Sequence, residues 1–168
     1  IKSVVDSGKQ VLFLVPEIAL TTQLVSRLKH TFGDLVGVYH SRFGMNERAE
    51  LWRDVKSNLR FPIIIGARSS VFLPFDDLGL IIVDEEHESS FKQQDPAPRY
   101  QARDVAVFMG HHYNSNVVLG TATPSLETSY NVNKGKYGLY SLKQRFGGFS
   151  FPKIHIVDIA HAYKRKRM

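Results

Sequence analysis

The amino-acid sequence predicts an α/β fold in which a doubly wound parallel β-sheet is flanked by helices on both faces. Four uninterrupted apolar runs predict its strands, at residues 11–15, 63–65, 80–83 and 117–119. Because these runs show no alternation of apolar and polar side chains, they are typical of strands that are buried on both faces. Strands that alternate with helices along the chain give a layered architecture with right-handed crossovers.

Helices are predicted in the segments that separate the strands. Apolar side chains recur at helical spacing in residues 24–32, 51–59 and 102–109. A fourth helix is expected to begin with Thr123 as its N-cap and Pro124 at the first helical position. The chain is long enough for these elements to bury one apolar core.

Two segments interrupt this alternation of strands and helices. Residues 154–157 form a weaker candidate for a fifth strand. The segment from Glu88 to Arg99 is polar and contains Pro96 and Pro98. A connection of this length inside a compact domain is usually functional or disordered.

Composition restricts the class of protein. The 168 residues include no cysteine, which excludes disulfides and thiolate metal sites, and no apolar run approaches the roughly 20 residues of a membrane span. The first ten residues lack the pattern of a signal peptide, and a cytosolic location fits. The 22 basic and 16 acidic residues give a net charge of +6, which favours a polyanionic partner such as nucleic acid. Basic residues 164–167 indicate a solvated tail or the start of a linker.

The strand at residues 80–83 runs directly into three carboxylates and a histidine, Asp84-Glu85-Glu86-His87. In a parallel sheet these side chains lie at the carboxyl end of a strand, where open α/β sheets bind ligands. Adjacent carboxylates repel one another, so a cation is expected nearby, and Mg²⁺ bound to a nucleotide needs only one or two of them. An acidic surface turn, or a metal site built on His87 and Glu85, is the alternative.

A second strand, at residues 117–119, ends in a glycine followed by two hydroxyl side chains. The sequence there is Gly120-Thr121-Ala122-Thr123. Glycine permits close backbone approach, and the hydroxyls are positioned to bond the acids or His87 from a neighbouring strand. Simple helix capping by Thr123 is the alternative.

These two strand-end sequences resemble motifs II and III of superfamily 2 helicases, and the Asp-Glu-Glu-His form matches the PriA family. The resemblance implies a RecA-like motor lobe that binds ATP and Mg²⁺. In it, Asp84 holds Mg²⁺ through water, and Glu85 orients and deprotonates the attacking water. His87 links the nucleotide state to the rest of the motor. Coupling of hydrolysis to movement is assigned to Gly120, Thr121, Ala122 and Thr123.

Residues 15–21 resemble motif Ia, which contacts single-stranded DNA in related motors. The resemblance assigns DNA contacts to Pro16, Glu17 and Thr21, where hydroxyls and helix-opening amides suit a phosphate. Without the family context, the same residues describe only a strand, a turn and a helix start. The dipeptide His40-Ser41 also matches the family, although a lone histidine is more often structural.

Residues 65–70 resemble motif Ib, another DNA-contacting segment. Ala67 departs from the family pattern, in which threonine is common, and this removes one hydroxyl. The resemblance assigns Arg68 and Ser69 to DNA binding, with Arg68 contacting a phosphate or bridging motifs. A weak surface ion pair is the alternative for Arg68.

The segment that follows motif II resembles the aromatic-rich loop of PriA-type and RecQ-type helicases. That loop senses single-stranded DNA and relays its presence to the ATP site. The resemblance assigns DNA contacts to Phe91, Lys92, Tyr100 and Arg103, since aromatic and basic side chains suit base stacking and phosphate contact. The alternative is that Phe91 and Tyr100 attach the loop to the core. Residues 95–98 contain two prolines that stiffen it.

The resemblance covers residues 8–158 and implies that the chain is part of a longer protein. No G-x-x-x-x-G-K-[ST] phosphate loop is present. In the family it lies just before this sequence, whereas the second lobe, its arginine finger and the zinc-binding cysteines follow. We therefore expect residues 1–158 to be an incomplete first motor lobe, residues 159–168 to be a basic tail or linker, and the chain alone to hydrolyse no ATP.

The complete protein is expected to be an ATP-dependent 3′→5′ DNA helicase that binds stalled or branched forks and restarts replication by primosome assembly. Its implied partners are single-stranded and branched DNA, primosome proteins and single-strand-binding proteins, in the bacterial cytoplasm near the nucleoid and without a membrane. Zinc is expected only outside this chain. The alternatives are a RecQ-like or restriction-type translocase, or a nucleic-acid binding module that does not hydrolyse ATP.

Overall fold

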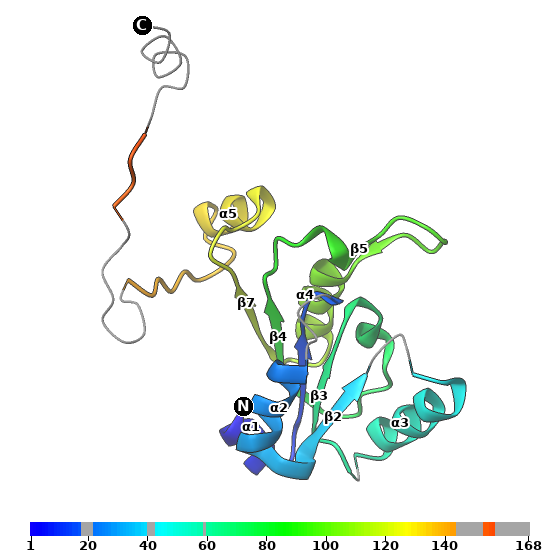
Figure 1. The fold of residues 1–168 in the computed structure, drawn as a ribbon. Coiled ribbons are helices and arrows are strands. Elements are labelled where there is room, and N and C mark those ends of the chain that lie inside the picture. Colours follow the sequence, from blue (N-terminus) through cyan, green and yellow to red (C-terminus); the bar gives the residue numbers. More distant parts are fainter. Residues whose placement is uncertain (18–21, 40–42, 59, 144–152, 157–168) are drawn as a thin grey trace, which may run out of the picture. The chain divides into compact units, whose positions relative to one another are not determined.

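The computed structural model describes most of the chain, namely residues 1–17, 22–39, 43–58, 60–143 and 153–156. The chain falls into two compact units, residues 1–130 and residues 131–168. The first unit contains the β-sheet and the helices that cover it (Figure 1). The boundary expected at residue 158 lies outside the described residues.

The sheet has five parallel strands in the spatial order β2-β3-β1-β4-β7. The strands are β1 (Gln10–Leu14), β2 (Val36–Tyr39), β3 (Ile63–Gly66), β4 (Leu78–Asp84) and β7 (Asn116–Gly120). The register pairs Leu14 with Gly66 and with Val83, and Asp84 with Gly120. Because all strands are parallel, the segments that leave these carboxyl ends start from one edge of the sheet.

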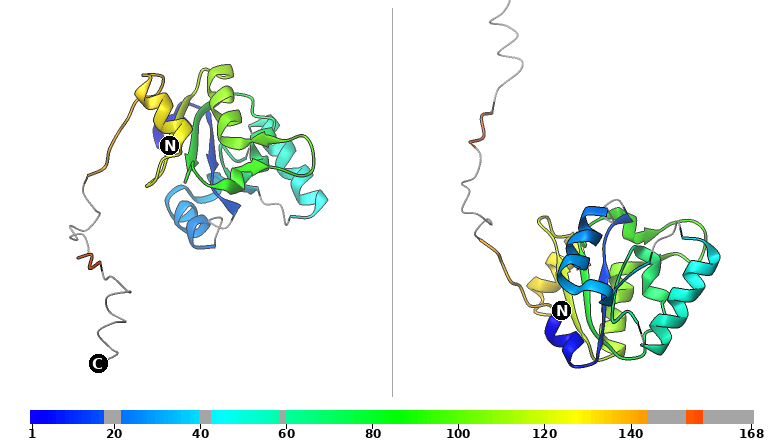
Figure 2. Two further views of the ribbon diagram at one scale, coloured as in Figure 1. Left: turned by 90° about the horizontal axis from the view of Figure 1, so that it is seen from above. Right: turned by 60° about the horizontal axis from the view of Figure 1, so that its bottom comes forward.

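Helices cover both faces of the sheet (Figure 2). They are α1 (Lys2–Asp6), α2 (Thr22–Phe32), α3 (Met45–Ser57), α4 (Ala102–His112) and α5 (Leu126–Asn133). Val11 and Ile63 pack on the side of α1 and α2, whereas their neighbours Leu12 and Ile64 pack on the side of α3 and α4. All four side chains are fully buried. Two apolar layers therefore enclose the central strands, whereas the edge strand β7 is only partly covered, with Val118 51% exposed. This arrangement confirms the predicted doubly wound α/β class.

The four strands predicted from continuous apolar runs are present, and β2 is an additional strand. Its sequence, Val-Gly-Val-Tyr, is too short and too interrupted to stand out. A Cβ at Gly37 would lie 2.8 Å from the Ile64 Cδ1 atom, so glycine allows a close approach there. The weak fifth strand at residues 154–157 is wrong, because Ile154 and Ile156 are almost fully exposed outside any strand. Val157 lies outside the described residues.

The helices predicted over residues 24–32, 51–59 and 102–109 correspond to α2, α3 and α4. The predicted N-cap of the fourth helix is wrong by two residues, since α5 begins at Leu126. The backbone N–H of Thr128 donates to the Ser125 Oγ at 3.2 Å, so Ser125 caps this helix. Thr123 instead belongs to the turn that follows β7.

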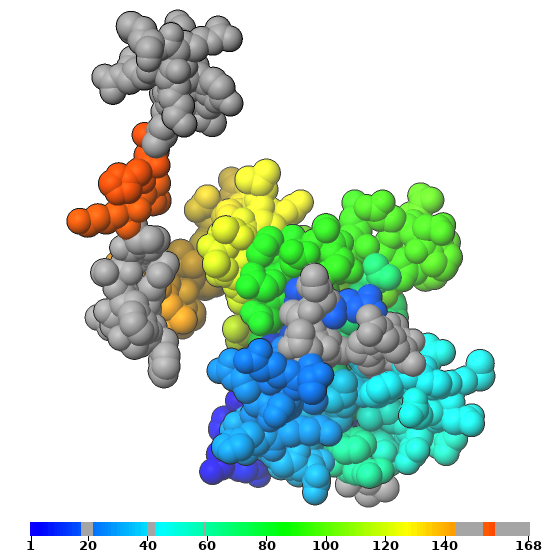
Figure 3. Space-filling model, in the orientation of Figure 1, coloured from blue at the N-terminus to red at the C-terminus, as the bar shows by residue number. Residues whose placement is uncertain are grey.

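The segment after β4 forms short regular elements rather than an open loop. A 3₁₀ turn, η4 (Ser89–Phe91), leads into β5 (Lys92–Gln93), which pairs antiparallel with β6 (Tyr100–Gln101). We call residues 92–101 the β5–β6 hairpin; it projects from the first unit (Figure 3). Its second strand continues directly into α4. A further 3₁₀ turn, η3 (Arg68–Phe72), follows β3, and η2 (Gly33–Leu35) precedes β2.

The second unit contributes little regular structure among its described residues. After the end of α5, the N–H of Lys136 donates to the Asn131 carbonyl at 2.9 Å, and Gly135 takes a left-handed φ of 70°. Within the described part of the chain, none of the helices has the length and apolar character required to cross a bilayer.

Candidate functional site

The predicted motif residues gather at the carboxyl edge of the sheet because of its register. Asp84 is paired with Gly120, so the sequences after β4 and β7 leave the sheet side by side. The segments after β1 and β3 leave from the same edge, since Leu14 is paired with both Gly66 and Val83. Residues that are up to about a hundred positions apart in the sequence therefore surround one rim of the sheet.

Glu85 occupies a left-handed backbone conformation with φ of 50°. This conformation costs a residue with a Cβ roughly 1–2 kcal/mol, so it persists only where the surroundings impose it. The N–H of Glu85 donates to the Asp84 Oδ1 at 3.1 Å, and the Glu85 carbonyl accepts from the Glu88 N–H at 2.8 Å. The Glu85 side chain is 45% exposed, which leaves its carboxylate open to solvent.

His87 joins the sequence after β4 to the sequence after β7. Its Nδ1 lies 2.8 Å from the Thr121 Oγ1, and its Nε2 lies 3.4 Å from the Thr123 Oγ1. The Glu85 Oε2 is 3.6 Å from the same Nδ1. Thr121 also accepts the backbone N–H of Thr123 at 3.0 Å. The contact predicted between the threonine hydroxyls and His87 is present.

The four residues that follow β7 have different environments. Gly120 is half-buried. A Cβ at this position would make only ordinary van der Waals contacts with Asp84, so lack of space is not the reason for a glycine here. Thr121 is half-buried under His87, whereas Ala122 and Thr123 are exposed. Of these four residues, Thr121 makes the shortest hydrogen bond to His87 and is therefore the one most closely joined to the segment after β4.

Glu86 is the carboxylate that sequence reasoning did not distinguish, and it is fully buried. Its Oε1 accepts the Ser125 N–H at 2.7 Å, and its Oε2 lies 3.1 Å from the Arg103 Nη1. The Thr128 hydroxyl donates to the Glu86 Oε2 at 2.9 Å, and the Ser125 hydroxyl lies at 3.0 Å from it. Only its position in a run of three acids is visible in the sequence, which gives no sign of burial.

Glu86 is held in its charged form despite its burial. Burial alone raises the pKa of the Glu86 carboxyl, but the hydrogen bonds from Ser125, Thr128 and Arg103 outweigh this effect and lower the pKa below its ordinary value. Burial alone lowers the pKa of Arg103, yet its contacts with Asp104 and Glu86 raise the pKa above the usual arginine value. The two residues therefore form a buried ion pair.

The structure corrects two of the predicted DNA contacts. The Phe91 side chain is fully buried in the core on the α4 side of the sheet, so its ring presents no surface to a base. Arg103 is only 7% exposed, and its guanidinium is bound by Glu86, Asp104 and Ser125 rather than free for a phosphate. The alternative, in which Phe91 attaches this segment to the core, is the one observed.

Arg68 connects the turn after β3 to the β5–β6 hairpin. Its Nη1 donates to the Lys92 carbonyl at 3.0 Å and to the Ser90 carbonyl at 3.3 Å. Burial raises the pKa of the Tyr100 hydroxyl, although the Arg68 charge acts in the opposite direction. Arg68 therefore bridges two of the predicted motifs, and neighbouring Ser69 is exposed.

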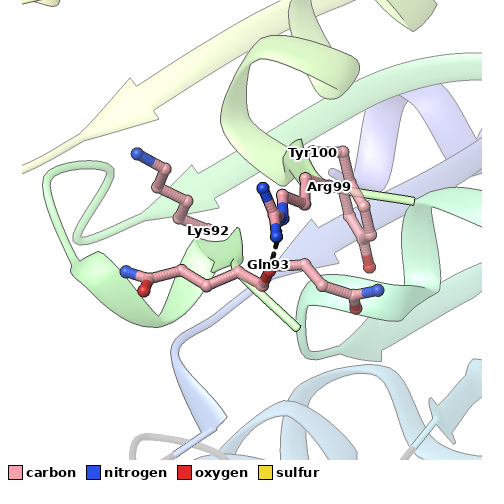
Figure 4. Close-up of a pocket in the computed structure, with 5 residues that line it drawn as sticks. Lys92, Gln93, Arg99 and Tyr100 are labelled. Atoms are coloured by element: carbon pink, nitrogen blue, oxygen red, sulfur yellow. Dashed lines mark hydrogen bonds between the residues drawn. The ribbon is translucent and has the colours of Figure 1, made fainter. Parts of the chain in front are cut away.

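A hollow of about 440 Å³ lies against the β5–β6 hairpin (Figure 4). The side chains that line it are Lys92, Gln93, Gln94, Arg99 and Tyr100. The Arg99 Nε donates to the Gln94 carbonyl at 2.9 Å, and the Tyr100 ring packs edge-on against the exposed Phe72 at 4.8 Å between ring centres. Positive charge, amides and aromatic rings thus meet on one exposed surface, which suits single-stranded nucleic acid.

The remaining predicted DNA contacts lie after β1 or outside the described part. Pro16 is buried, so its ring is not available to DNA, whereas Glu17 is exposed. Thr21, His40 and Ser41 are outside the described residues.

The carboxylates at the rim fit a magnesium ion that is shared with a nucleotide. Asp84 is half-buried and Glu85 is partly exposed, which offers the one or two carboxylates that a hydrated Mg²⁺ takes from a protein. Across the described residues, no group of three or more His, Cys, Asp or Glu side chains forms a metal cluster. The alternative of a metal centre built on His87 and Glu85 therefore lacks ligands there.

The five-stranded parallel sheet with acids at its carboxyl edge is the arrangement of a RecA-like domain. A family model of the DEAD/DEAH box helicase matches residues 1–132, and the chain belongs to this family. It is 45% identical over 160 residues, 95% of its length, to the replication restart protein PriA of Bacillus subtilis. It is 48% identical over 152 residues, 90% of its length, to PriA of Chlamydia trachomatis.

The chain spans about a fifth of the length of these relatives, since each alignment covers 20% of the relative. Among solved structures, the C-terminal domain of the DEAD-box protein Dbp5 is similar, with a TM-score of 0.51 and 12% identity. That match covers 77% of this chain and 72% of the Dbp5 domain and shows a shared fold. The predicted helicase family and the RecA-like fold are thereby confirmed.

Proposed function

We propose that the chain is part of the first motor lobe of an ATP-dependent DNA helicase that acts in replication restart. One observation carries the proposal: Asp84, at the end of β4, is paired with Gly120 at the end of β7, and His87 contacts Thr121 of the neighbouring segment. This arrangement joins the acids of motif II to the hydroxyls of motif III. The likeness to PriA relatives supports the assignment to replication restart.

In the proposed reaction, Asp84 would hold the Mg²⁺ of ATP through water, and Glu85 orients the water that attacks the terminal phosphate and accepts its proton. Mg²⁺ supplies charge neutralisation on the phosphates when ATP is bound. Glu85, in its left-handed turn, keeps its carboxylate partly exposed. His87 passes a displacement of this turn to Thr121.

For the DNA contacts, we retain the exposed or half-exposed residues of the predicted set. These are Glu17, Arg68, Ser69, Lys92 and Tyr100, with Thr21 remaining a sequence-based prediction. The charged and aromatic surface of the β5–β6 hairpin adds Arg99. We further propose 3′→5′ movement on branched DNA, association with primosome and single-strand-binding proteins, zinc outside this chain, and a location in the bacterial cytoplasm near the nucleoid.

The 168 residues contain no G-x-x-x-x-G-K-[ST] phosphate-loop sequence. We therefore propose that ATP hydrolysis requires the full-length protein, in which a phosphate loop and a second lobe complete the site.

The test is DNA-stimulated ATPase of the full-length protein with Glu85→Gln. This change keeps the shape of the side chain and removes the base, so we expect turnover to fall roughly 100-fold or more. Glu88→Gln, three residues further along, is the matched control and should turn over at the wild-type rate. Undiminished hydrolysis by Glu85→Gln would exclude the proposed role of Glu85.

A further inference from the structure

Glu86 takes no part in the proposed reaction, yet it is the most constrained acid at the rim. It is fully buried and accepts hydrogen bonds from three residues, Arg103, Ser125 and Thr128. A buried ion pair is weak evidence for stability, because an apolar pair of the same volume often stabilises a core equally well. A buried carboxylate that stays charged at this position therefore indicates that Glu86 serves to position the residues around it rather than to stabilise the fold.

Glu86 fixes the turn that carries Glu85. Its backbone N–H donates to the Gly120 carbonyl at 3.1 Å, while its side chain is held by Ser125 and Arg103. Asp84, on the other side of Glu85, is fixed by its pairing with Gly120. Glu85 is thus clamped between two immobilised neighbours, which accounts for its left-handed φ of 50°.

Arg103 connects this turn to the β5–β6 hairpin. It is the second residue of α4, and α4 begins directly after β6, which contains Tyr100. Arg103 has little freedom, because its Nη1 lies 3.1 Å from Glu86 and 2.7 Å from the Ser125 Oγ, and its Nε lies 2.9 Å from Asp104. A movement of the hairpin that shifts the start of α4 therefore acts directly on Glu86.

We infer that the buried Glu86–Arg103 pair positions the hydrolytic turn and links it to the hairpin. This inference rests on the proposed function, since it assigns Glu86 and Arg103 as positioning residues for that reaction. When single-stranded DNA binds the hairpin, the pair transmits the new position of the start of α4 to Glu85. Its loss lowers DNA stimulation of ATP hydrolysis more than it lowers ATP binding.

The experiment compares ATPase of the full-length protein with and without single-stranded DNA for the wild type, Glu86→Gln, Arg103→Gln and the double variant. We expect the ratio of stimulated to basal kcat to fall at least fivefold in each variant, with KM for ATP within twofold of the wild type. The double variant leaves no unpaired buried charge, so its Tm should return toward the wild-type value while the ratio stays low. This combination separates positioning from stability.

Glu127→Gln is the matched control, because its carboxylate lies 3.9 Å from the same Arg103 Nη1 but is 70% exposed. It should keep the wild-type ratio. If a single variant fails to melt cooperatively, the double variant and Arg103→Lys decide, since both avoid leaving Glu86 as a lone buried charge. Arg103→Lys keeps the positive charge but lacks the planar guanidinium. Its ratio of stimulated to basal kcat should therefore lie between those of the wild type and Arg103→Gln.

The outcomes are distinguishable from failure of the proposed function. A wild-type protein without DNA-stimulated ATPase would overturn the proposed function itself. A stimulated wild type whose folded variants keep the full ratio would overturn the link alone. A double variant that regains the ratio together with its Tm would also overturn it, because the pair would then act only through stability.

Discussion

The Nδ1 of His87 lies 2.8 Å from the Thr121 Oγ1, and this contact joins the ends of two neighbouring parallel strands. His87 follows β4 and Thr121 follows β7, so the hydrogen bond spans 34 positions of sequence. The backbone N–H of Thr123 reinforces it by donating to the same hydroxyl. A small displacement of the Glu85 turn therefore reaches the segment after β7 through one side-chain contact.

Removing the Thr121 hydroxyl should weaken coupling more than ATP binding. Thr121→Val keeps the shape and deletes one hydrogen bond, worth about 1 kcal/mol, which corresponds to a roughly fivefold effect. We expect the DNA unwound per ATP hydrolysed by the full-length protein to fall by about this factor, as measured by paired unwinding and ATPase assays. Thr31→Val, which removes the exposed hydroxyl that donates to the Arg27 carbonyl within α2, is the control and should behave as the wild type.

The same contact predicts non-additive effects of paired substitutions. If His87 and Thr121 act through one hydrogen bond, then His87→Ala combined with Thr121→Val should lose no more coupling than His87→Ala alone. Fully additive losses in the double variant would show that the two residues act independently.

The isolated 168-residue chain should show no DNA-stimulated ATP hydrolysis. Its rim offers Asp84 and Glu85 but lacks the phosphate loop and the arginine of a second lobe, each worth orders of magnitude in rate. Phosphate-release assays with Mg²⁺, ATP and single-stranded DNA test this, and calorimetry should give only very weak nucleotide binding. Measurable stimulated turnover would mean that the site is complete without those parts.

The β5–β6 hairpin should bind single-stranded DNA through both charge and base stacking. Titrations at several salt concentrations separate the two contributions, because the charge contribution weakens as salt increases. Lys92→Ala and Arg99→Ala should each reduce the slope of log affinity against log salt by roughly 0.7 in the full-length protein. Tyr100→Ala should cost roughly 1–3 kcal/mol at every salt concentration. Fluorescence anisotropy titrations measure both.

Lys29→Ala is the charge-matched control for this prediction, because Lys29 lies in the last turn of α2, away from the carboxyl edge. It should leave affinity and salt slope unchanged. Equal slopes for all three charge variants would place the DNA elsewhere.

Arg68 should hold the hairpin against the body of the lobe. Its hydrogen bonds to the Ser90 and Lys92 carbonyls come from a charged donor, and bonds of this kind are worth about 1.5–3 kcal/mol. Arg68→Ala should therefore speed amide exchange in the hairpin roughly tenfold or more, as measured by hydrogen–deuterium exchange of the full-length protein. Arg53→Ala, at an exposed position of α3, is the control, and equal exchange in both variants would contradict the bridging role.

The sequence was sufficient for the class of fold and for the place of the motif. Continuous apolar runs are typical of strands covered on both faces, although Val118 in the edge strand β7 is 51% exposed, and a run that ends in acids places them at the carboxyl end of its strand. The pairing of Asp84 with Gly120 follows once the two strands are neighbours. The short β2 and the start of α5 escaped prediction because their patterns are weak, and Ser125 and Thr123 are both accepted N-caps in isolation.

What the tertiary structure alone decided is which polar and aromatic side chains are buried. In the sequence, nothing marks Glu86 as more buried than Glu85, and Phe91 and Arg103 resemble residues that contact DNA. Burial depends on where α4 and α5 pack over the turn after β4, and these contacts join residues 17 to 42 positions apart. Local patterns report secondary structure and strand ends, whereas the packing of distant elements sets the environment of each charge.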